Sequence, residues 1–154
     1  MGTDSIAVFI GESITNMNNI TAAAYGATNN YGLFNYDSSS NARNSTAATN
    51  GLNSYGIYNG DAVLSISNVT ATAWGTGTGY SLYQDTSHGP PSLINADRST
   101  FEGNTDSAYI YFGAGANVLM GGSKLIGPVV TSDSTLTCAH SYNGDYIELG
   151  PNCQ

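Results

Sequence analysis

The sequence is poor in basic residues, in charge of any kind and in long apolar runs. Its 154 residues contain 3 Lys and Arg against 11 Asp and Glu, which gives a formal net charge of −8. Such an acidic surface repels phosphate backbones and anionic lipid headgroups, so nucleic acid is a poor partner. No apolar run approaches the roughly 18 residues that a membrane-spanning helix needs, so we expect no membrane insertion.

Cysteine is scarce as well, and the start of the sequence does not read as a secretory leader. Cys138 and Cys153 are the only two cysteines, and no further Cys or His stands at metal-ligand spacing beside them. This pattern favours one disulfide over a metal site, and a disulfide predicts an extracellular or cell-surface location. The start, MGTDSIAVFI, lacks a basic segment and a long apolar stretch, so we expect a fragment or a mature segment.

What the sequence has in abundance is glycine, serine, threonine and asparagine, arranged in a repeat. Asn-x-Thr units begin at Asn19, Asn44 and Asn68, and a fourth, degenerate unit begins at Asn95. A period of this size predicts a solenoid, in which each repeat buries its apolar side only against its neighbours. Each unit contains three short strand-like pieces, exemplified by VTATA, YGIYN and LSISN, which is typical of a β-solenoid.

The units SYGIYN and SNVTATA, with the closing SKLIGPVVTSDSTLTCAHSYNGDYIELGPNC, resemble bacterial surface proteins of the right-handed parallel β-helix type. The resemblance is to the C-terminal portion of such proteins, in the pectin-lyase-like superfamily, and covers roughly residues 18–154. It implies an all-β, right-handed parallel β-helix of about five coils of 24–28 residues. We expect one domain, 1–154, with a partial first coil (1–19), repeat coils (20–126) and a disulfide-stapled cap (127–154). The resemblance implies a fold and not a reaction, because β-helices host many functions.

The alternation of residues predicts which side chains face the core. We expect the core to contain two sets from the second strand of each coil: Leu33, Ile57, Leu82 and Ile110, and the tyrosines Tyr31, Tyr55 and Tyr80. The outward row is then Phe34, Tyr58, Tyr83 and Tyr111. This row is the candidate ligand-binding surface, for sugar rings or for another protein. The alternative is that the rings only stabilise the sheet by cross-strand stacking.

Polar residues recur at the turns. Asn44, Asn68 and Asn95 are expected to close the third strand and to stack their amides. Asp37, Asp61 and Asp85 recur at a fixed interval after the second strand. Three interpretations of this aspartate row are open: a copied turn preference, a weak Ca²⁺ site, or catalytic carboxylates one coil apart. We assign no catalytic residue, metal site or cofactor from the sequence.

These features predict a non-enzymatic, secreted or cell-surface module with a structural or adhesive role, in contact with a polysaccharide or surface glycan. The alternative is a glycan-cleaving enzyme, either a tailspike-like glycosidase or a polysaccharide lyase. Self-association is also expected, because the N-terminal end, with its apolar IAVFI strand, leaves an unprotected edge.

Overall fold

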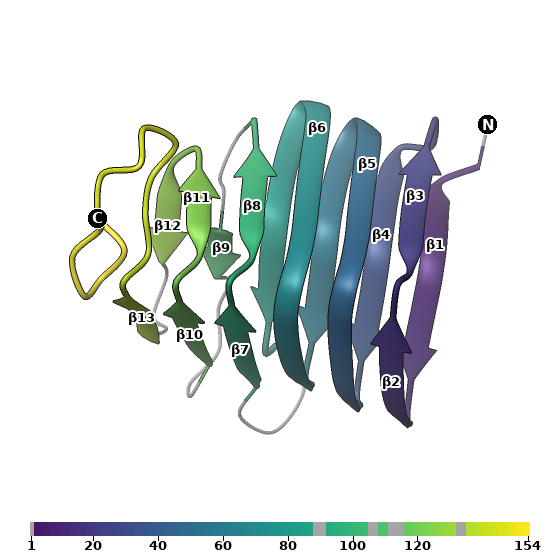
Figure 1. Ribbon diagram of the computed structural model, residues 1–154. Coiled ribbons are helices and arrows are strands. Elements are labelled where there is room, and N and C mark those ends of the chain that lie inside the picture. The colour runs from purple at the N-terminus through teal and green to yellow at the C-terminus, as the bar shows by residue number, and fades with distance from the viewer. Residues whose placement is uncertain (1, 88–91, 105–107, 111–115, 132–134) are drawn as a thin grey trace.

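A computed structural model describes residues 2–87, 92–104, 108–110, 116–131 and 135–154. The described residues form 13 strands, paired in parallel, that wind into an all-β parallel solenoid of about four turns (Figure 1). The strands are β1 (Asp4–Gly11), β2 (Ile14–Asn18), β3 (Thr21–Tyr25), β4 (Asn29–Tyr36), β5 (Ser39–Gly60), β6 (Val63–Asp85), β7 (Leu93–Asp97), β8 (Thr100–Gly103), β9 (Ala108–Ile110), β10 (Asn117–Gly121), β11 (Lys124–Ile126), β12 (Val129–Thr131) and β13 (Thr135–Ala139).

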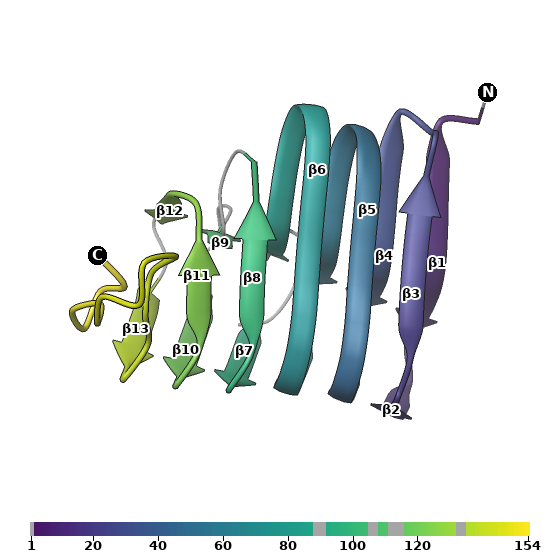
Figure 2. The same cartoon turned by 45° about the horizontal axis from the view of Figure 1, so that its top comes forward.

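The coils stack along one axis from β1 at the N-terminal end to β13 near the C-terminus (Figure 2). The first coil is complete, because β1 pairs with β4 while β2 and β3 both pair with β5. The strands β5 and β6 each run unbroken through the corners of their coils. The parallel solenoid expected from the repeat is therefore confirmed, and its four turns are close to the five expected. Among the described residues, no helix is long and apolar enough to cross a membrane.

The core contains the predicted aliphatic row and an amide ladder beside it. Leu33, Ile57 and Leu82 are buried and lie in register on neighbouring coils. The alanines of the first strand, such as Ala22, Ala47 and Ala71, are buried as expected, whereas the threonines beside them are exposed. The core is thin because small side chains face large ones, which lets the coil close tightly.

The expectation that Tyr31, Tyr55 and Tyr80 lie in the core is wrong. Their rings pack on the outward row; for example, the centroids of Tyr31 and Phe34 are 5.0 Å apart. Strict alternation fails because Gly32 and Leu33 are both buried, so that Tyr31 and Phe34 face the same side. A Cβ at Gly32 would lie 2.7 Å from the carbonyl oxygen of Gly56, which explains why this inward position is a glycine.

The last outward position of the row is also shifted from the prediction. β9 pairs with β6 so that Tyr109 lies opposite Tyr83 and Ile110 lies opposite Gln84. The expected alignment of Ile110 with Leu82 is therefore wrong. Tyr109 takes the register position that we assigned to Tyr111, and Tyr111 itself lies outside the described residues.

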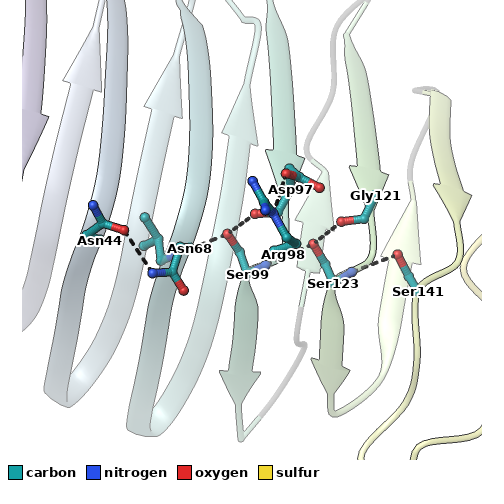
Figure 3. A network of polar contacts seen from close by, with 9 residues as sticks. Asn44, Asn68, Asp97, Arg98, Ser99, Gly121, Ser123 and Ser141 are labelled. Carbon is teal, nitrogen blue, oxygen red and sulfur yellow. Dashed lines mark hydrogen bonds and ion pairs between the residues drawn. The ribbon is translucent and has the colours of Figure 1, made fainter.

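The corner before the first strand is held by a side-chain ladder (Figure 3). The Asn44 amide donates to Asn18 Oδ1 at 2.9 Å, and the Asn68 amide donates to Asn44 Oδ1 at 2.8 Å. Asn95 does not join this ladder, because it lies within β7, opposite Ser65. Arg98, with φ 46°, takes the left-handed corner position instead.

The shift arises from extra residues in this coil. Two residues separate Gly60 from Val63, whereas seven separate their partners, Asp85 and Leu93. From this coil onward serines replace asparagines at the corner: Ser99 Oγ accepts from the Val69 N–H at 3.1 Å and donates to the Asp97 carbonyl at 2.9 Å. Figure 3 shows the same arrangement repeated one coil further, at Ser123.

The C-terminal end is covered and stapled. Cys138 and Cys153 form the predicted disulfide, with their Cα atoms 5.2 Å apart, and both side chains are buried. The Cys138 N–H donates to the Pro151 carbonyl at 2.8 Å, so the tail folds back along the outer edge of β13. Lys124 Nζ lies 3.8 Å from the centroid of the Tyr146 ring and ties the tail to the coil beside it.

Candidate functional site

The most prominent surface is an aromatic ladder of two columns that run along the solenoid. We use this name for Phe9, Phe34, Tyr58 and Tyr83 in one column and Tyr31, Tyr55 and Tyr80 in the other. In the first column successive ring centroids are 5.6, 4.6 and 5.1 Å apart, and each pair is stacked. In the second column the distances are 4.9 and 5.7 Å. The columns meet edge to face, as where the rings of Tyr55 and Tyr58 cross at 82°.

This geometry determines what the ladder can present to a ligand. Because each inner ring is stacked between its neighbours, its flat face is covered and its edge points outward. The exception is Phe9 at the end of the column, which is 61% exposed. Aromatic pairs of this kind contribute about 0.5 to 1.5 kcal/mol each beyond the area they bury, so the ladder stabilises the coil stack. Ligand binding by Phe34, Tyr58 and Tyr83 stays a prediction.

Two tyrosines of the ladder have perturbed acidities. Burial raises the pKa of Tyr31 to about 12, with smaller contributions from Tyr55 and Asp4. Burial also raises the pKa of Tyr58, and the hydrogen bond that its hydroxyl donates to Asp85 Oδ2 at 2.6 Å adds to the effect. Both phenols are therefore neutral donors over the physiological range.

Three acidic residues line a cavity of about 460 Å³ at the turn after the second strand. Glu12, Asp37 and Asp61 occupy equivalent left-handed positions on successive coils, with φ between 45° and 48°. The Asp61 side chain is only 8% exposed, and its Oδ1 has no hydrogen-bond partner among the described residues. We call this feature the acidic cavity.

Asp85 does not belong to the aspartate row that the sequence predicted. It lies opposite Gly60, one position before the turn, and accepts the Tyr58 hydrogen bond instead. The cause is a register shift between Gly51 and Asn53, where β6 carries an extra residue relative to β5. Within the part of the chain that the structure describes, no group of three or more His, Cys, Asp or Glu side chains is arranged to hold a metal ion.

A second hollow, of about 530 Å³, crosses four successive parallel strands, β6, β7, β10 and β13. We call it the strand groove. Two outward rows line it. The first row is Ser65, Asn95, Leu119 and Thr137; the second includes Asp97, Gly121 and Ala139. The small side chains at Gly121 and Ala139 leave the hollow, and Asp97 at the rim is paired with Arg98 Nε at 2.8 Å.

The strand groove combines the two kinds of contact that bind an uncharged polar ligand. Asn95 offers an amide donor and acceptor, and Ser65 and Thr137 offer hydroxyls. Leu119, which is exposed, offers an apolar patch among them. With strands about 4.8 Å apart, the outward rows run for about 14 Å along the solenoid axis, so the groove suits an elongated ligand.

Sequence reasoning missed this groove. Its signal is the run of small outward residues at equivalent positions of the third strand, Ser67, Gly121 and Ala139. The signal was hidden because the lengthened coil before β7 displaced the alignment. Comparisons with known proteins find no matching family model, no similar curated protein and no similar solved structure. The evidence for function therefore comes from the geometry of the chain itself.

Proposed function

We propose that the protein is a non-enzymatic structural and adhesive module, secreted or displayed at a cell surface, that contacts a polysaccharide or surface glycan through the strand groove. The observation that carries the proposal is the groove itself, which places amide, hydroxyl and aliphatic groups in rows across four parallel strands. Sugars present hydroxyls and C–H patches at regular intervals, and such rows match both. The resemblance of the repeats to pectin-lyase-like β-helices supports the same assignment.

The location follows from the staple at the C-terminal end. The bond between Cys138 and Cys153 persists in oxidising surroundings, which favours secretion or surface display. The structural role follows from the side-chain ladders. Rings, amides and hydroxyls bond from coil to coil on several corners and faces, which suits a rigid rod.

A glycan array with matched variants tests the proposal. Gly121→Val fills the strand groove with little strain, because a Cβ at Gly121 meets only Asp97 Oδ1, at 3.5 Å. We expect this variant to lose glycan binding by at least about tenfold while its melting temperature is kept. Ala23→Val, which adds carbon atoms on an exposed position of β3, is the matched control and should bind as the unchanged protein does.

The same array separates the groove from the aromatic ladder. The double variant Tyr58→Ala with Tyr83→Ala removes two ladder rings and leaves the groove lining intact. If this variant loses binding while Gly121→Val keeps it, glycan contact lies on the ladder edge and the groove assignment is wrong. No binding by any of these proteins across neutral and acidic glycans contradicts the carbohydrate role altogether.

The acidic cavity supports one alternative, a glycan-cleaving enzyme. Glu12, Asp37 and Asp61 lie one coil apart, so that neighbouring positions are about 5 Å apart and the outer two about 10 Å. These separations bracket those of retaining and inverting glycosidases. Release of reducing ends or of unsaturated sugars from polysaccharides, abolished by Asp37→Asn or Asp61→Asn, would establish this activity in place of the non-enzymatic role.

A further inference from the structure

The N-terminal coil leaves its whole outer edge without a strand partner. β1 pairs only with β4, and β2 and β3 pair only with β5, among the described residues. This edge also carries four large exposed apolar side chains: Ile6 at 42%, Phe9 at 61%, Ile14 at 82% and Tyr25 at 59%. An open edge with exposed apolar groups is a template for pairing with another chain. The C-terminal end is different, since the tail at Pro151 covers the edge of β13.

The N-terminal edge has an approximate two-fold symmetry of its own. A line from the middle of β1, between Ala7 and Val8, to the corner at Asn19 and Ile20 divides the coil into two nearly equal halves. β2 lies on one side of the corner and β3 on the other, and each has five residues. A half-turn about this line reverses β1 onto itself and exchanges β2 with β3.

We propose that two copies of the chain associate head to head through this edge, with β1 antiparallel to β1 of the second copy and β2 antiparallel to β3. In that register the outward Ile6 lies opposite Phe9 of the second copy. At the flanks, the exposed Ile14 lies opposite Tyr25. Four exposed apolar residues per copy are then covered by their own counterparts.

The alternation of the strands is consistent with this pairing throughout. Met17 and Ala22, both buried, lie opposite each other, so inward positions meet inward positions. Asn18 and Thr21, both exposed, meet on the outside. A register shifted by one residue would bring buried positions opposite exposed ones, which sheets do not tolerate. The edge is therefore complementary to itself.

The size and charge of the edge fit a reversible dimer. A coil of 25 residues lies within the 20 to 30 residues that each side of a standard interface contributes, about 800 Å² per partner. The first 28 residues contain Asp4 and Glu12 and no Lys, Arg or His. Two copies therefore bring four carboxylates toward one another, and added salt should strengthen association by screening them.

Sedimentation equilibrium of the 154-residue protein over micromolar to millimolar concentrations is the direct test. We expect the mass to rise from 15.9 kDa toward twice that value, and the dissociation constant to fall as NaCl increases. A mass of 15.9 kDa at all concentrations and salts would overturn the proposal and leave the edge to an upstream coil of a longer chain. Growth beyond a dimer would also overturn it, because a head-to-head contact closes on itself.

Two lysine variants locate the contact. Ile14→Lys changes a side chain that is almost fully exposed in the single chain, so the fold should persist while dimerisation weakens by at least about tenfold. Leu52→Lys makes the same kind of change at an exposed leucine one coil away from the edge and should leave the dimer intact. Equal weakening by both variants would show that added charge acts non-specifically.

Cysteine cross-linking fixes the orientation. The two-fold line passes beside Asn19, so Asn19→Cys in each copy should come within disulfide reach under mild oxidation. Asn44→Cys is the matched control, because it has the same left-handed backbone but lies one coil further in, beyond reach. Cross-linked dimer from Asn44→Cys, or none from Asn19→Cys in a protein that still dimerises, would rule out the head-to-head arrangement.

Discussion

At Gly32 a hydrogen atom in place of a side chain lets neighbouring coils approach. A Cβ there would lie 2.7 Å from the Gly56 carbonyl oxygen and 3.1 Å from the Ala47 Cβ across the core. Backbone cannot yield as a flexible side chain does, so Gly32→Ala should cost about 1 to 3 kcal/mol of unfolding free energy. Gly121→Ala, with its nearest neighbour at 3.5 Å, should be neutral or stabilising. Urea unfolding of both variants measures the difference, and equal stabilities would contradict the tight packing at Gly32.

Tyr58 links stability to pH through its hydroxyl. The pKa of Tyr58 is raised in the folded protein, and the pKa of Tyr31 is raised to about 12, whereas an unfolded chain ionises its tyrosines near pH 10. A raised pKa gives stability that is complete below the unfolded value and is lost as pH rises through the folded one. We therefore expect the unfolding free energy to fall between about pH 10 and 12.

The variant Tyr58→Phe tests this account. Removing the hydroxyl deletes the hydrogen bond to Asp85, which should cost about 1 to 2 kcal/mol near pH 7. It should also flatten the loss of stability above pH 10, because one fewer group titrates differently in the two states. Chemical denaturation at several pH values measures both effects. An alkaline slope as steep as that of the unchanged protein would show that other groups carry the dependence.

At this scale the sequence predicted the aliphatic core positions and the disulfide, because hydrophobicity and cysteine pairing act locally. Leu33, Ile57 and Leu82 are buried as expected. The tyrosines at positions such as Tyr31 were misplaced, because period-2 alternation assumes an unbroken pleat. A close approach at Gly32 that turns two successive residues inward depends on the neighbouring coil, which is not visible in one repeat.

Between coils, the buried amide ladder is the element that most constrains the register. The Asn35 amide donates to Asn59 Oδ1 at 2.6 Å, and the Asn59 amide donates to Gln84 Oε1 at 2.9 Å. All three side chains are fully buried. Because a buried donor without a partner loses its full hydration energy, Asn59→Ala should cost about 2 to 4 kcal/mol.

The exposed ladder supplies the control. The Asn41 amide donates to Asn16 Oδ1 at 2.9 Å on the surface, where water replaces a lost partner. Asn41→Ala should therefore cost less than about 1 kcal/mol. Denaturant unfolding of the two alanine variants compares the ladders. If Asn41→Ala proves as costly as Asn59→Ala, burial is not what makes the inner ladder important.

The element scale also shows why two polar rows were assigned with errors. The repeat of 24 to 27 residues was enough to predict stacked coils, because copies of one unit must bury their apolar sides against each other. It was not enough to align the third coil with the fourth. An extra residue opposite Gly51 and Asn53 moves Asp85 out of the acidic row, and the longer path from Asp85 to Leu93 moves Asn95 out of the corner. Insertions preserve the pitch of a solenoid while they shift its numbering.

For the molecule as a whole, stability is a property of coils and their contacts with neighbours. Each coil touches only the coils before and after it, so unfolding can begin at an end and proceed inward. The N-terminal edge is bare, and the C-terminal end is closed by the disulfide and by the pairing of Lys124 with Tyr146. The two ends should therefore differ in how readily they open.

Removing the staple should reverse this difference. In the chain-entropy account a bridge that closes a loop of about 15 residues contributes up to about 3 kcal/mol, so Cys138→Ala with Cys153→Ala should loosen the cap by that order. Hydrogen exchange should then become faster first in β13, next in β10 and last in the long strands β5 and β6, because opening spreads from coil to coil. Uniform acceleration in all strands would mean that the solenoid unfolds as one cooperative unit. Unchanged exchange in β13 would mean that burial of the tail, rather than the bond within it, closes this end.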